Sequence, residues 1–199
     1  MDLQDVREKY KRKNKILFSR DSACLQDLLQ LIRKQNHRTL VCWAFECVGE
    51  PLQILKTHYP DEKRPETAVR LSMAWAEGKI KMPEAKKAIL QVHAAAKEIA
   101  DPADIALCHA VGQACATVHV ESHAIGLPVY ELTAIVHQHG IENCGPAIAD
   151  KIQYYMKCLA LCAQTTDAAP SRWADFLLDD SRPNKELLVF QKKQSQKQG

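Results

Sequence analysis

Proline stands at or just before the start of a helix-forming run at five places in the chain: Pro65, Pro83, Pro102, Pro128 and Pro146. Proline is tolerated in the first turn of a helix because the N–H that it lacks has no intrahelical partner there. Asp101 precedes one of these prolines, and its carboxylate can accept hydrogen bonds from the free N–H groups of the turn that follows. The prolines therefore divide much of the chain into a series of short helices.

Apolar residues between these breaks recur at steps of three and four, which places one apolar stripe on each helix. No segment shows the sustained alternation of apolar and polar residues that is typical of strands. The connections are short, which favours antiparallel neighbours. We expect a single all-α domain, built as an antiparallel multi-helix bundle or as stacked helical hairpins. Four of the stripes are Leu25, Leu28, Leu29 and Ile32; Leu40, Trp43, Ala44 and Cys47; Ala85, Ala88, Val92, Ala95 and Ile99; and Ile148, Ile152, Tyr155, Leu159 and Cys162.

Charge is distributed unevenly along the chain. Residues 1–20 hold seven Lys or Arg and three Asp or Glu, and residues 182–199 hold five and one, so each end is +4. Because the whole chain is +3, residues 21–181 are net −5, which does not favour binding of nucleic acid by this part. We expect a basic, partly ordered segment over 1–20, an all-helical domain over 21–181 and a disordered Gln/Lys-rich tail over 182–199.

The sequence also bears on the compartment. The apolar run at residues 16–18 is far too short for the core of a signal peptide. The longest uncharged stretch, residues 105–120, is too short and too polar to span a bilayer. Without an export signal, the eight cysteines are expected to be reduced thiols. We therefore expect a cytoplasmic protein that has no membrane anchor, binds no nucleic acid and needs no cofactor.

Two histidines four residues apart lie in the stretch 116–126, "ATVHVESHAIG". On one continuous helix, His119 and His123 would be about 40° apart and could share a metal ion. In zinc hydrolases of the His-Glu-x-x-His type, the glutamate directly follows the first histidine and stays near the metal-bound water. Glu121 is instead two positions from each histidine, which would turn its carboxylate to the opposite side of the helix. This spacing is not that of a zinc hydrolase.

The same helical projection places the histidines beside small residues and opposite a polar stripe. Small residues permit close approach of a neighbouring helix, so we expect His119 and His123 to be interior, structural histidines whose ring nitrogens are hydrogen-bonded. A metal site on this pair stays open as an alternative, and it would need a third ligand from another part of the chain. The small residues are Cys108, Gly112, Cys115 and Gly126; the polar stripe is Gln113, Thr117 and Glu121; the possible third ligands are His93, Cys108, His109, His137 and His139.

Three pieces of the sequence, taken in order, resemble immunity-family-5-like proteins of bacterial polymorphic toxin systems. The pieces are "LVCWAFECVGEPLQILKTHYPDEKRPETAVRLSMAWAEGKI" at 40–80, "AAAKEI" at 94–99 and "AVGQACATVHVESHAIGLPVYELTA" at 110–134. The resemblance covers residues 37 to 165. It implies an all-α cytoplasmic protein without chemistry of its own, which binds and neutralises a cognate toxin. It carries over no catalytic or toxin-contact residues.

Candidate binding residues follow from the chemistry of the matched segments. Asp61 and Arg64 flank a proline-bounded loop and are expected to form a local charge pair. Trp75 is expected in the core, although tryptophan is also enriched at binding hot spots. The remaining candidates form the polar stripe, Gln113, Thr117 and Glu121. The net acidic middle of the chain suits a basic toxin domain as the protein partner. Two alternatives remain open: a metal-dependent helical hydrolase using His119 and His123, and a small-ligand binder or scaffold with a pocket beside the glycine–histidine face.

Overall fold

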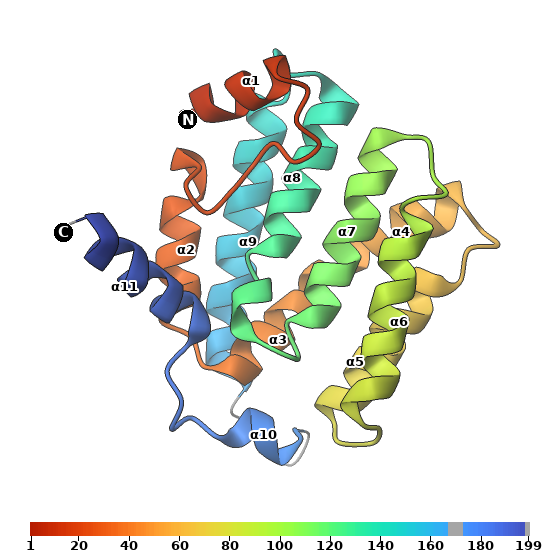
Figure 1. Cartoon of the computed structure of the whole chain (residues 1–199), viewed down its shortest axis with the longest axis vertical. Coiled ribbons are helices and arrows are strands. Elements are labelled where there is room, and N and C mark those ends of the chain that lie inside the picture. The colour runs from red at the N-terminus through yellow and green to blue at the C-terminus, as the bar shows by residue number, and fades with distance from the viewer. Residues whose placement is uncertain (167–172, 198–199) are drawn as a thin grey trace.

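The computed structural model describes residues 1–166 and 173–197, and the regular elements in these ranges are helical. Figure 1 shows the helices packed into one body. The prediction of an all-α bundle is confirmed. The helices are α1 (Gln4–Lys11), α2 (Gln26–Arg33), α3 (His37–Cys47), α4 (Gly49–His58), α5 (Arg64–Ala76), α6 (Met82–Ala95), α7 (Pro102–Ala116), α8 (Gly126–His139), α9 (Gly145–Thr165), α10 (Asp175–Leu178) and α11 (Lys185–Lys197), with short 3₁₀ turns η1 (Ala23–Leu25) and η2 (Glu121–His123).

The predicted helix starts agree well with the structure. Proline occupies one of the first two positions of α5, α6, α7 and α9. Asp101 caps α7, because its carboxylate accepts hydrogen bonds from the N–H groups of Ala103 at 2.9 Å and Asp104 at 3.0 Å. The predicted apolar stripes of α2, α3 and α9 are buried throughout, and in the α6 stripe only Ile99, beyond the end of the helix, is half-buried.

Helix α7 lies at the centre of the fold. It packs most extensively against α8, and it also contacts α6, α5, α4 and α3. Most of its residues are buried, many of them Ala, Gly or Cys, so the helix is apolar nearly all round. These small side chains let neighbouring helices approach closely. A methyl group at Gly112, for example, would lie 2.5 Å from the ring of His93 on α6.

The two ends of the chain pack against the helical body and meet each other on the same side of it (Figure 1). The loop after α1 is tied to α8, where the N–H of Leu17 donates to the Thr133 hydroxyl at 3.2 Å. Arg20 then donates through Nε to the buried carboxylate of Glu186, at the start of α11. Composition alone favours disorder after residue 181, whereas the structure places helix α11 there, because this partly buried ion pair and the apolar side of the helix anchor it. The domain boundaries themselves stay a prediction.

Candidate binding site

Helix α7 ends before the two histidines that the sequence places on it. It stops at Ala116, the backbone turns over residues 117–120 with Val120 fully extended, and the 3₁₀ turn η2 follows. The expectation of one continuous helix through His119 and His123 is therefore wrong. Thr117, Val118 and Val120 are β-branched and have low helix propensity, which explains why α7 does not continue.

His119 is exposed, so the expectation that it is interior is also wrong. Its ring lies against Trp75 of α5, with 6.2 Å between the ring centroids. Trp75 also stacks against Phe176 of α10, with ring centroids 5.6 Å apart. Trp75 is 8% exposed and Phe176 is 44% exposed. His119, Trp75 and Phe176 thus form a partly exposed group of rings, here called the aromatic cluster, where α5, α10 and the turn after α7 meet.

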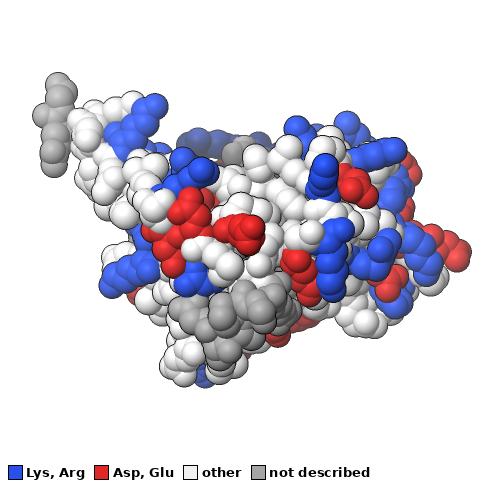
Figure 2. All heavy atoms as spheres, turned by 90° about the horizontal axis from the view of Figure 1, so that it is seen from below, with Lys and Arg blue, Asp and Glu red and all other residues white. Residues whose placement is uncertain are grey.

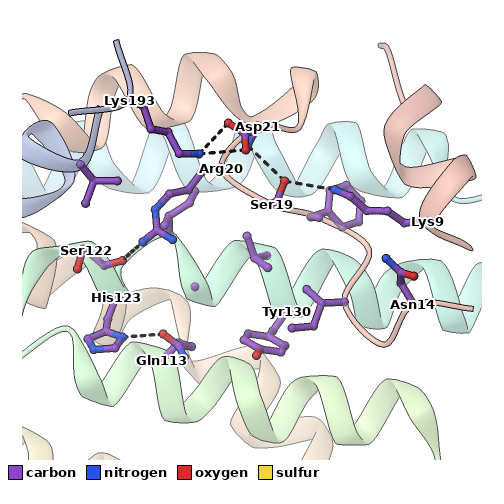
Figure 3. A pocket seen from close by; sticks show the side chains of 16 residues that line it. Lys9, Asn14, Ser19, Arg20, Asp21, Gln113, Ser122, His123, Tyr130 and Lys193 are labelled. Carbon is purple, nitrogen blue, oxygen red and sulfur yellow. Dashed lines mark hydrogen bonds and ion pairs between the residues drawn. The ribbon is translucent and has the colours of Figure 1, made fainter. Parts of the chain in front are cut away.

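His123 faces the opposite way, into the molecule, and is half-buried. Its Nδ1 lies 2.8 Å from Oε1 of Gln113, so the imidazole donates from Nδ1 and the amide oxygen accepts (Figure 3). The bond depends on Gly126, since a methyl group at this position would lie 2.5 Å from the Gln113 oxygen. Gln113 is therefore a partner of His123 rather than part of a solvent-facing stripe.

A hollow of about 710 Å³ opens beside His123 and Gly126, where the small-ligand alternative expects a pocket. Figure 3 shows the residues of the loop after α1 and Lys193 of α11 on one side of it, facing His123, Gln113 and Tyr130 on the other. Arg20 donates from one guanidinium nitrogen to the Ser122 carbonyl at 2.5 Å. Lys193 of α11 forms an ion pair with Asp21 at 3.0 Å. The charged groups at this rim are thus largely paired with one another.

Glu121 and Thr117 belong to a separate, buried contact with the start of α3. Glu121 is only 8% exposed, and its carboxylate lies 3.8 Å from Nδ1 of His37. The other ring nitrogen of His37 donates to the carbonyl of Thr117 at 2.7 Å. The expected polar stripe opposite the histidines therefore does not face solvent. It joins the turn after α7 to α3.

The possible third metal ligands are dispersed, apart from one pair. Nδ1 of His93 on α6 lies 2.8 Å from Nδ1 of His109 on α7, so one ring donates and the other accepts. His109 also packs against the ring of Tyr130, with centroids 5.1 Å apart. Within residues 1–166 and 173–197, no three His, Cys, Asp or Glu side chains lie close enough together to hold a metal ion. The geometry brings no such ligand set to His119 and His123.

Asp61 and Arg64 do not pair with each other, contrary to expectation. Asp61 is exposed on the loop before α5. The Arg64 guanidinium instead binds Glu62 and, from across the loop, Glu98 after α6. Hydrogen bonding from Arg64 lowers the pKa of the Glu62 carboxyl. The arginine therefore serves to connect the α4–α5 loop to the end of α6.

Sequence reasoning missed a buried polar network between α3, α8 and α9. The Tyr155 hydroxyl donates to the carboxylate of Glu131, which also forms an ion pair with Lys151. Trp43 donates from its indole N–H to the Tyr155 carbonyl at 3.0 Å. The sequence did contain a signal for this network. Glu131 and Lys151 each occur at a spacing of three or four from apolar residues, on the buried face of an otherwise apolar helical stripe.

Comparison with known proteins identifies the family. Residues 30–158 match the family described as "Imm-5 like putative immunity protein". The match spans well over half of the 199 residues. The chain belongs to this family. No curated protein and no solved structure matches it. The Imm-5-like region runs from α2 to α9, so it contains Trp75 and the turn with both histidines, whereas α1, α10 and α11 lie outside it. Membership of an immunity family implies a protein partner.

The Gln113–His123 contact predicts a specific effect of adding one methyl group. We expect Gly126→Ala to displace Gln113, break its hydrogen bond to His123 and lower the free energy of unfolding by about 1–3 kcal/mol. The matched control is Gly49→Ala, also at the first residue of a helix, where an added methyl meets no atom within 4 Å. The free energy of unfolding of the control is expected to lie within about 0.5 kcal/mol of the wild-type value, or to exceed it. Urea unfolding of both variants tests this, and equal losses would contradict the assigned role of Gly126.

Half-buried histidines predict sensitivity to acid. Burial lowers the pKa values of His93, His109, His123 and His137. Below a pH of about 6.5, the unfolded chain therefore binds more protons than the folded chain, and the free energy of unfolding decreases as pH falls. Urea unfolding between pH of about 7.5 and about 5.5 measures the decrease. His109→Phe keeps a ring packed on Tyr130 and should reduce the decrease, whereas exposed His139→Gln should not. A stability that rises toward acid would refute the assignment.

Proposed function

We propose that this protein is an immunity protein that binds a cognate bacterial toxin and neutralises it without catalysing a reaction of its own. The match of residues 30–158 to an immunity family carries this proposal. The same family membership supports action in the cytoplasm, where an immunity protein meets its toxin. Within the described residues, no helix is long and apolar enough to cross a membrane.

We further propose that the aromatic cluster contacts the toxin. Aromatic side chains are enriched among the residues that dominate binding energy, and Phe176 and His119 are the accessible members of this cluster. The packed ring of Trp75 beneath them holds both in place, which reduces the entropy lost on binding. Of the predicted binding residues, Thr117 and Glu121 are buried, so they act by holding the turn that presents His119.

The charges around the cluster support a basic toxin domain as the partner. Asp175, Asp179 and Asp180, at α10 and just after it, are exposed, and two of them form ion pairs, Asp179 with Arg182 and Asp180 with Arg38. Figure 2 shows the α10 end of the molecule, where acidic and basic side chains both occur and the basic ones gather toward the α5–α6 side. Asp175, directly beside Phe176, gives the aromatic cluster an exposed acidic neighbour that would attract a basic partner.

Co-expression with a candidate toxin taken from the neighbouring open reading frames tests this proposal. We expect the wild-type chain to restore growth and Phe176→Ala with His119→Ala to lose at least about tenfold in protection, as is typical of hot-spot truncation. The matched control is Leu90→Ala on α6, which removes a 57% exposed apolar side chain from another face. Equal protection by wild type, the double variant and the control would contradict the proposal that the aromatic cluster contacts the toxin. No protection by wild type would contradict the proposed function itself.

A further inference from the structure

A second hollow, of about 1060 Å³, adjoins the first at Asn14 and has an unusual charge distribution. It opens between the turn after α1 and the connection from α6 to α7. Four lysines line it, and no Asp or Glu does: Lys11, Lys13, Lys15 and Lys97. So many cations around one concave site repel one another unless an anion is present.

The carboxylates nearest in sequence are already used elsewhere. Glu98 is bound to Arg64, and Asp101 caps helix α7. Among the described residues, no carboxylate forms an ion pair with any of the four lysines. This contrasts with the rim of the 710 Å³ hollow, where Arg20 and Lys193 are paired with Glu186 and Asp21. The four ammonium groups thus remain available to a ligand.

Apart from the lysines and Asn14, the wall of the hollow is made of aliphatic and aromatic side chains. It contains aliphatic side chains from the α6–α7 connection and the first turns of α7, with Tyr10 from α1 and the rings of His109 and His137. Ligand sites of small molecules typically combine such apolar walls with a few polar groups, and enclose roughly 300–1,000 Å³. The aliphatic members are Ala96, Ile99, Pro102 and Ile105.

The backbone holds the lysine-bearing turn in one conformation. Lys13 has a positive φ of 57°, which is uncommon for a residue with a side chain. The N–H of Lys13 donates to the Tyr10 carbonyl at 2.9 Å, and that of Asn14 donates to the Lys9 carbonyl at 3.0 Å. These bonds stabilise the backbone of the turn that carries Lys11 and Lys13, which reduces the backbone entropy lost when a ligand binds there.

We propose that this hollow binds a small organic anion that carries a carboxylate or phosphate group on an apolar body. The lysines bind the anionic group, and the aliphatic wall binds the body. This site is separate from the aromatic cluster, so the proposal does not depend on the proposed toxin contact.

Isothermal titration of the full chain with decanoate, decanol and inorganic phosphate tests both halves of the proposal. Decanoate is expected to bind at least about tenfold more tightly than either probe that lacks the charge or the chain. Extending the acyl chain from octanoate is expected to tighten binding by about fourfold for each added methylene. If decanol binds as tightly as decanoate, the lysines do not bind an anionic group. If phosphate binds as tightly as decanoate, the aliphatic wall does not contribute to binding. Either result would overturn the proposal.

Variants then locate the binding. Lys13→Gln with Lys15→Gln is expected to weaken decanoate binding by about tenfold, because two of the four charges are lost. The matched control is Lys86→Gln with Lys87→Gln, which removes the same charge from exposed positions of α6 that do not line the hollow. Equal weakening by both pairs, or no binding of decanoate at all, would overturn the proposal. Binding of poly-glutamate without binding of decanoate would assign the lysines to an acidic protein and overturn it as well.

Discussion

Glu131→Ala is expected to lower the free energy of unfolding by about 3–5 kcal/mol, because it breaks a buried ion pair by removing one partner. Glu131 is 3% exposed and lies between the ammonium group of Lys151 and the hydroxyl of Tyr155, both of which are also buried. Without the carboxylate, the Tyr155 hydroxyl has no acceptor and Lys151 keeps only its bond to Glu50, at 2.7 Å. Equilibrium urea unfolding, followed by circular dichroism, measures the loss.

The charges of this network are interdependent. Burial alone would lower the pKa of Lys151, but the carboxylates of Glu131 and Glu50 more than offset it, and the net pKa is raised. Lys151 is therefore held as a cation, and it needs the buried carboxylate opposite it.

Two variants make the prediction specific. Glu50→Gln removes a carboxylate that is 65% exposed, so it is expected to cost less than about 1 kcal/mol. Glu131→Leu combined with Lys151→Met replaces the ion pair with apolar groups and is expected to recover much of the loss. A Glu131→Ala loss below about 1 kcal/mol would mean that the network is not satisfied as described.

Trp43→Ala is expected to cost about 3–5 kcal/mol, since it empties the largest buried side-chain volume in α3. Trp43 is fully buried, packs edge-on against Tyr155 with centroids 5.7 Å apart and donates to the Tyr155 carbonyl. Trp43→Phe keeps most of the volume but loses the donor, so a smaller loss of about 1–2 kcal/mol is expected.

The control for Trp43 is a solvent-exposed apolar residue on another helix. Leu161→Ala on α9 truncates a side chain that is 60% exposed, and its expected effect is within about 0.5 kcal/mol. Thermal and urea unfolding of the three variants test the expected order of stability loss, which is largest for Trp43→Ala, smaller for Trp43→Phe and smallest for Leu161→Ala. Equal stability of Trp43→Ala and Leu161→Ala would contradict the assignment of Trp43 to the core.

Much of the helical framework could be predicted from sequence because its signals are local. The stripe from Ile148 to Cys162 reports which face of α9 is buried, and Asp101 followed by Pro102 marks the start of α7. Such patterns depend on neighbours three or four residues away, and the structure retains them.

The candidate site could be predicted only in part. It depends on where a helix ends and on contacts between residues that are far apart in the sequence. The small residues from Cys108 to Gly126 keep helical spacing past the true end of α7 at Ala116, whereas the β-branched residues Thr117, Val118 and Val120 disfavour continuing the helix. The partners of Arg64, Glu121 and Glu131 come from other helices or from beyond a turn. No spacing within one segment reports such contacts.

Inhibition of the purified toxin tests the central claim most directly. A toxin domain from a neighbouring open reading frame is titrated with the full chain, and the remaining toxin activity is measured. We expect activity to fall in proportion to added protein and to vanish near equivalence, as for a tightly bound inhibitor. Unchanged toxin activity in the presence of a large excess of the folded chain would contradict the assignment of this protein as the toxin's immunity partner.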